Sequence, residues 1–304
     1  MKVNFKFFVT IPLLLVSMVC FANDGAFRVN GNQLIPMYET DISVKKEILS
    51  IKAIGSGQAS VEVYYEFFNP KETKELEVGF EAFTPCGDVD AKPMDGEHPY
   101  IGNFSVSING LLIPYKVAIE RDSLYFRNGK YKTMSKADVL KESEDNDMVN
   151  FFYVYHFRIL FNKGLNIIHH TYVVDLSSSV EELYSFEYVL TAAGRWANRQ
   201  IDDFTLNIDV GDFQDLSIKN TFFKTAADWQ IKGTGKRIVR KSDEADEEMT
   251  EFFIRKGSLI FQKKNFKLVA ELYIHAYNSY DFREKQLRAR IHFLIMKEIP
   301  CHSP

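Results

Sequence analysis

The chain has little cysteine. It contains three cysteines in 304 residues, and Cys20 lies in an N-terminal segment that we expect to be removed. Cys86 and Cys301 then remain, and they could form one disulfide in an oxidising compartment. One bridge cannot support a disulfide-stapled scaffold. Stability must therefore come from a packed core, and the chain is long enough to bury one.

The sequence also lacks the short motifs of several enzyme classes. It has no nucleophile elbow, no phosphate-binding loop and no zinc-protease helix motif. Its 37 basic and 41 acidic residues give a formal net charge of −4, and no basic stripe is present. We therefore expect no nucleic-acid binding and no cofactor.

Long apolar runs are absent except at the N-terminus. Residues 1–22 carry Lys2 and Lys6, then FFVTIPLLLVSMV, and they end in Cys-Phe-Ala. This is the pattern of a secretory signal peptide cleaved after Ala22, and a lipoprotein signal acylated on Cys20 is the alternative. No later stretch is long and apolar enough to span a bilayer. We expect an exported protein, periplasmic or on the cell surface, with no transmembrane span in the mature chain.

Aromatic and β-branched residues, in contrast, are abundant, with 26 Phe and 15 Tyr. The longest such run covers 149–175 and reads VNFFYVYHFRILF, NKG, LNIIHHTYVVD. Strand composition on both sides of Asn-Lys-Gly predicts a β-hairpin, with Gly164 supplying the left-handed turn conformation. In that register the odd-numbered residues of both strands face the core, and His156 lies opposite His170 on the other face.

Alternating patterns elsewhere predict further strands, and Asn109-Gly110 predicts a tight hairpin turn. We expect an all-β fold, an antiparallel β-sandwich of one large or two packed lobes, with a short C-terminal helix that begins at a capping box formed by Asp281 and Glu284. The predicted divisions are a signal peptide (1–22), an N-terminal β lobe (23–125), an acidic helical or loop insertion (126–148), a C-terminal β lobe (149–277) and a helical tail (278–304).

Two segments, YYEFFNP and TAAGRWANRQIDDFTLNIDV, carry a resemblance to a known family. The shared features are a strand ending in Thr and Gly, a Trp two residues later, then Ile-x-Asp-Phe and an alternating strand. Here they are Thr191, Gly194, Trp196, Ile201, Asp203, Phe204, Leu206 and Ile208. The chain resembles a family of exported bacterial proteins known as a domain of unknown function, some members of which carry a C-terminal YARHG module. The tail FREKQLRAR is similar to the start of that module and departs from it after Arg290. The resemblance implies export and a β fold, and it implies no activity.

Two groups of residues are candidate sites. His156 and His170, if they are opposite, have the spacing of two zinc ligands, and a surface or hydrogen-bonded histidine pair is the alternative. The second group combines aromatic surface with charge of both signs, which suits a carbohydrate or peptide that stacks on the indole. In the alternative arrangement, Trp196 fills the core and the charges pair around it. The second group consists of Arg195, Trp196, Arg199, Asp202 and Asp203.

Other polar residues carry weaker signals. The acidic runs 142–147 and 243–248 lack the ligand spacing of a calcium loop and are interpreted as solvated loops. Cys86 with His98 would be a thiol nucleophile and its base, but nothing in the sequence marks His98 for that role.

These observations favour a non-catalytic binding or scaffold module of the cell envelope, with an envelope protein or a glycan as partner. The alternative is a periplasmic hydrolase acting on glycan or peptide through the Asp202 and Asp203 region or a His156/His170 metal site. That alternative requires the side chains of each group to converge on one place.

Overall fold

A computed structural model places most of the chain. It describes residues 30–32, 34–36, 40–54, 57–83, 96–120, 126–127, 130–131, 136–145, 151–178, 182–209, 211, 214–241 and 248–277. The predicted signal peptide, Cys86, Cys301 and the predicted C-terminal helix lie outside these ranges. Within them, no helix is long and apolar enough to cross a membrane.

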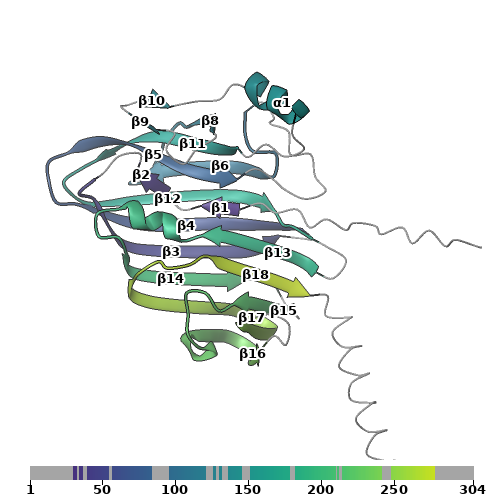
Figure 1. The fold of residues 1–304 in the computed structure, drawn as a ribbon. Helices are drawn as coiled ribbons and strands as arrows, with labels where there is room; N and C mark the ends of the chain where they lie inside the picture. Colours follow the sequence, from purple (N-terminus) through teal and green to yellow (C-terminus); the bar gives the residue numbers. More distant parts are fainter. Residues whose placement is uncertain are drawn as a thin grey trace, which may run out of the picture.

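One sheet of twelve strands dominates the molecule (Figure 1). Its strands lie in the order β1-β13-β18-β15-β17-β14-β3-β4-β12-β6-β7, and β16 pairs with β17. In chain order they are β1 (Asn30–Asn32), β3 (Ser43–Ile54), β4 (Gln58–Asn69), β6 (Ile101–Ile108), β7 (Leu111–Leu112), β12 (Gly164–Asp175), β13 (Glu182–Val189), β14 (Ile201–Asp209), β15 (Gln214–Lys219), β16 (Trp229–Lys241), β17 (Glu248–Phe266) and β18 (Leu272–Tyr277).

The remaining elements are smaller. A four-stranded sheet has the order β2-β5-β11-β8, and a two-stranded sheet joins β9 and β10. Their bounds are β2 (Leu34–Pro36), β5 (Lys74–Phe83), β8 (Lys116–Glu120), β9 (Phe126–Arg127), β10 (Lys130–Tyr131) and β11 (Phe152–Phe161). The helix α1 (Lys136–Asp145) lies within the segment predicted as an acidic helical or loop insertion, and η1 (Thr191–Arg195) and η2 (Ala226–Asp228) are short 3-10 helices.

The expectation of a β-rich fold is confirmed for the described residues, but the large sheet is mixed rather than purely antiparallel. β14 runs parallel to β3, and β1 runs parallel to β13. β3 and β14 can be parallel neighbours because all elements from β4 to η1 lie between them in the chain, and parallel strands require such a long connection instead of a tight turn.

The predicted central hairpin is wrong. β11 pairs with β5 and β8 in the small sheet, whereas β12 lies between β4 and β6 in the large one. The Asn-Lys connector therefore carries the chain from one sheet to the other. Buried Asn166 holds this turn, because its side chain accepts from the backbone N–H of Asn162 (2.9 Å) and donates to the carbonyl oxygens of Asn162 (2.8 Å) and Gly164 (3.1 Å).

This connection reverses the predicted faces of β12 and leaves those of β11 as predicted. Odd-numbered residues of β11 are buried, and in β12 the even-numbered residues from Asn166 to Val174 are buried. The small sheet faces the large one through aromatic contacts. Ring centroids of Phe80 and Tyr172 lie 5.0 Å apart, and those of Phe104 and Tyr155 lie 4.8 Å apart. The core between the sheets is one hydrophobic cluster.

The buried positions of β17 change from even-numbered to odd-numbered residues along its 19 residues. Thr250, Phe252 and Ile254 are buried in its first half, and Leu259 and Phe261 in its second half. The change in numbering occurs at a β-bulge where Arg255 is the extra residue, next to a cross-strand pair of Gly233 and Gly257, so the same face of the strand stays toward the core on both sides of the bulge. With the glycine pair and the bulge in its middle, β17 pairs with β15 along its first half and with β14 along its second half.

Candidate functional site

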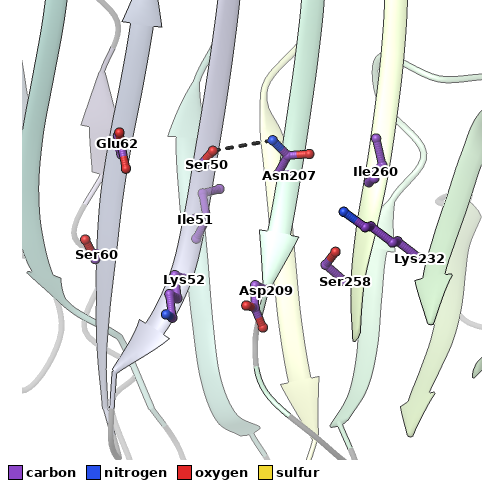
Figure 2. A pocket seen from close by; sticks show the side chains of 10 residues that line it. All are labelled: Ser50, Ile51, Lys52, Ser60, Glu62, Asn207, Asp209, Lys232, Ser258 and Ile260. Carbon is purple, nitrogen blue, oxygen red and sulfur yellow. Dashed lines mark hydrogen bonds between the residues drawn. The ribbon is translucent and has the colours of Figure 1, made fainter. Parts of the chain in front are cut away.

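The outer face of the large sheet carries a hollow of about 350 Å³ where β4, β3, β14, β17 and β16 lie side by side (Figure 2). Figure 2 shows side chains from all five strands around it. Its polar lining consists of Ser50, Lys52, Ser60, Glu62, Asn207, Asp209, Lys232 and Ser258.

Strand alternation explains why these residues share one face. In β3, Leu49 and Ile51 are buried, so the side chains of Ser50 and Lys52 point outward. The register then aligns neighbours in two rows across the sheet: Ser50 is paired with Glu62 and with Asn207, and Lys52 with Ser60 and with Asp209. Lys232 is paired with Ser258 on the far side. Because short serine side chains lie between longer charged ones, the surface is hollowed here.

Of the four charged side chains of the hollow, the two acidic ones have partners and the two lysines have none among the described residues. Glu62 contacts His169 (Oε1 to Nε2, 2.7 Å), and Asp209 accepts from the backbone N–H of Gly211 (3.2 Å). Lys52 and Lys232 have no hydrogen bond or ion pair among the described residues. The hollow therefore offers two available ammonium groups as well as hydroxyl and amide groups, which suits a polar ligand that bears an anionic group.

The structure places Trp196 in the core, which is the second of the two arrangements considered from the sequence. Its side chain is 1% exposed, its indole N–H donates to the carbonyl oxygen of Leu34 (2.9 Å), and its ring lies 4.4 Å from that of Phe67. A ligand outside the protein cannot stack on this ring.

The charged residues near Trp196 have separate partners. Asp202 binds Lys45 (2.8 Å), Asp203 binds Lys264 (2.6 Å), and Arg195 lies 3.6 Å from Glu81 of the small sheet. Partial burial raises the pKa of Asp202, but hydrogen bonds from Lys45, Gln200 and Asn198 outweigh this and lower it. Arg199 is exposed with a backbone φ of 47°.

These contacts link strands and loops to one another. They do not bring the four charged side chains together around one ligand position.

The two histidines of the predicted metal site are also apart. His156 contacts Glu77 in the small sheet (Nδ1 to Oε1, 2.9 Å), and His170 is fully buried in the core. The predicted opposition does not occur, because β11 and β12 do not pair. No group of three or more metal-ligating side chains occurs in the part of the chain that the structure describes.

His98 is a buried histidine whose ring nitrogens both have backbone partners. It is buried, its Nδ1 accepts from the backbone N–H of Tyr100 (3.1 Å), and its Nε2 lies 2.9 Å from the carbonyl oxygen of Phe83. Nε2 is therefore the protonated nitrogen of a neutral ring. Burial lowers the pKa of His98 to about 4, so the ring stays neutral at physiological pH.

Glu120 is a buried carboxyl group at the end of β8. It is fully buried, and neither of its side-chain oxygens has a hydrogen-bond partner among the described residues. Burial raises the pKa of Glu120 to about 8, because the charged form loses its hydration.

Glu120→Gln is expected to remove a pH dependence of stability. Between about pH 4.5 and pH 8 the native state holds a proton that the unfolded state releases, so the free energy of unfolding falls as pH rises, by up to about 4 kcal/mol. The variant should match the wild type near pH 4 and exceed it at pH 8 in urea unfolding. Glu75→Gln, at an exposed position of β5, should keep the wild-type slope. Equal slopes in the wild type and Glu120→Gln would contradict this assignment.

The hollow could not be located from the sequence. Alternation alone predicts that Ser50, Lys52, Asn207 and Asp209 face away from the core, as they do. Their grouping depends on the parallel pairing of β3 with β14, which joins residues 157 positions apart, as in the 3.4 Å hydrogen bond from Asn207 to Ser50.

Comparisons with known proteins give a similarity of fold and no match by sequence. No family model matches the chain, and no curated protein sequence matches it. Among solved structures, a "putative nutrient binding protein" from Legionella pneumophila is similar, with a TM-score of 0.52 and 15% identity over 85% of this chain and 74% of that one. The β-rich fold is thus shared with that bacterial protein.

A more distant similarity is to an M1 zinc metallopeptidase from Deinococcus radiodurans. The TM-score is 0.29 at 10% identity, over 78% of this chain and 43% of the peptidase. This chain matches less than half of the peptidase's length, and the similarity carries no argument about function.

Proposed function

We propose that the protein is a non-catalytic binding module of the bacterial cell envelope, and that its ligand-binding surface is the outer face of the large sheet around the hollow. The observation that carries the proposal is the pair of available ammonium groups, Lys52 and Lys232, on either side of Asp209 in a concave polar surface. The N-terminal sequence pattern supports export, and the fold shared with the Legionella protein is compatible with a binding role.

The surface has the properties that a binding site for a polar molecule requires. Its strands are anchored from behind by a fully buried cross-strand row that includes Leu49, Val63 and Leu206, so the polar groups lie on a rigid support. Hydroxyl groups from three strands and the Asn207 amide supply directional hydrogen bonds, and the lysines supply charge.

A ligand panel tests the proposal. Amino acids, short peptides, and neutral and acidic oligosaccharides are added to the mature chain, thermal shift is measured, and the dissociation constant of each hit is determined by calorimetry. Lys52→Gln and Asn207→Ala are each expected to weaken binding about tenfold, the loss of one hydrogen bond to a charged or polar group.

Lys46→Gln is the matched control. Lys46 lies on the same strand and face as Lys52, outside the hollow, beside Asp203. It should leave affinity unchanged. A panel without hits, or hits whose affinity is the same in Lys52→Gln and Lys46→Gln, would overturn the proposal.

A further inference from the structure

Cations continue from the hollow along the hairpin of β16 and β17. Lys232 borders the hollow, Lys256 is paired with Thr234, and Lys236 is paired with Phe253 across the same hairpin. Arg255 is the extra residue of the bulge. All four side chains are exposed, and none has an ion pair or hydrogen bond in the described parts of the chain. We call Lys232, Lys236, Arg255 and Lys256 the basic strip.

The glycine pair fixes the geometry of the basic strip. Gly233 and Gly257 face each other with φ angles of 128° and 114°, and their backbones approach so closely that a Cβ on Gly257 would lie 1.9 Å from the carbonyl oxygen of Lys232. Lys232 and Lys256 occupy the rungs on either side of this pair. They are therefore diagonal neighbours on one face of the hairpin.

The basic strip is not a consequence of overall composition. The chain has more acidic than basic residues, 41 against 37, and some other surface cations are paired, such as Lys45 with Asp202 and Lys264 with Asp203. Four unpaired cations within one short stretch of the hairpin repel one another unless an anionic partner is present. Their continuity with the hollow adds hydroxyl and amide groups to the same surface.

We propose that the basic strip and the hollow together bind an acidic glycan, a sugar chain that bears carboxylate or phosphate groups. This inference rests on the proposed function and specifies its ligand. The strip supplies cations for anionic groups spaced along a chain, and Ser50, Ser258 and Asn207 supply hydrogen bonds for sugar hydroxyls.

An anionic membrane surface fits less well. Membrane-surface binding combines cations with adjacent apolar side chains that enter the lipid. The most exposed large apolar residues are Leu111 (73% exposed), Leu112 (79%) and Val269 (74%). Leu111 and Leu112 lie on β7, at one end of the strand order and separated from β17 by five strands, and Val269 follows the C-terminal end of β17, away from the bulge at Arg255. Figure 1 shows β16 and β17 at the lower end of the sheet, and the strands of the small sheet at the upper end.

The test uses oligogalacturonate as the acidic probe and a neutral cello-oligosaccharide of the same length as its control. Calorimetry at two salt concentrations is run on the wild type and on the double variant Lys232→Gln/Lys256→Gln. We expect the acidic probe to bind at least tenfold more tightly than the neutral one. The double variant should raise its dissociation constant at least tenfold and reduce its salt dependence.

The matched control is Lys116→Gln/Lys141→Gln, which makes the same change in charge at exposed positions on β8 and α1. It should change affinity less than twofold. Phosphatidylglycerol vesicles and single-stranded DNA of equal charge are the competing polyanions. If either binds as tightly as oligogalacturonate, or if the two double variants behave alike, the inference is overturned.

The two proposals fail in different ways. If a neutral ligand binds, is weakened by both Lys52→Gln and Asn207→Ala and is unaffected by Lys232→Gln/Lys256→Gln, the binding site stands and the acidic glycan is wrong. If no ligand of the panel depends on Lys52, both proposals are wrong.

Discussion

Gly257→Ala is expected to destabilise the protein by about 3 kcal/mol or more, the sum of backbone strain at positive φ and a steric clash between strands. The new Cβ would lie 1.9 Å from the carbonyl oxygen of Lys232 and 3.0 Å from the Cα of Gly233. Both atoms are backbone, so neither can rotate away. The hairpin of β16 and β17 would have to open next to the bulge at Arg255. Urea unfolding of the wild type and the variant measures the effect.

Gly164→Ala is the matched control. Gly164 also has a positive φ, 94°, but a Cβ there would meet nothing within 4 Å. The control therefore isolates backbone strain, about 1 kcal/mol. If both variants lose the same stability, the close approach of the two strands at Gly233 and Gly257 is not the reason for glycine at position 257.

His170→Phe is expected to stabilise the protein in acid. The ring is fully buried, neither nitrogen has a hydrogen-bond partner in the part of the chain that the structure describes, and its centroid lies 5.7 Å from that of Tyr65 and 6.1 Å from that of Tyr172, both rings being stacked on it. Burial, with a smaller effect of neighbouring His169, lowers the pKa of His170 to about 3. The unfolded state then binds a proton that the native state excludes, and stability is lost as pH falls from about 6.5 to about 3, by about 5 kcal/mol for this residue.

Phenylalanine fills the same aromatic site without unpaired nitrogens, so the variant should gain about 1 kcal/mol at pH 7 and more at pH 4. Chemical unfolding at several pH values measures both. His98 contributes a loss of the same sign, which remains in the variant. His156→Gln, which removes an imidazole that is bonded to Glu77, is the control. A His170→Phe curve parallel to the wild type between pH 4 and 7 would contradict the prediction.

Local pattern predicted the strands well and their partners poorly. The alternation of Phe204, Leu206 and Ile208 in β14 indicates its buried face correctly, because each side chain's direction depends only on its own strand. The 149–175 segment shows the limit. Asn-Lys-Gly between two strands suits a hairpin, and the same tripeptide here joins two sheets. The side chain of Asn166 and the pairing of β12 with β4 decide between the two connections, and both are tertiary contacts.

The candidate site also depends on tertiary contacts. Trp196 and its charged neighbours are close together in the sequence, which suggests a site. In the structure the indole donates to Leu34, 162 residues away, and the charged side chains have separate partners. The hollow and the basic strip combine residues from β3, β4, β14, β16 and β17. No short segment contains them, so only the strand order shows that they share a surface.

We propose that the ligand binds on the outer face of the large sheet at the hollow, and backbone amide chemical-shift mapping with the tightest ligand of the panel tests this most directly. We expect chemical-shift changes concentrated at residues 50–52, 207–209, 230–234 and 256–260. Shifts concentrated instead at β7, or on the outer face of the small sheet around Leu160, would contradict it.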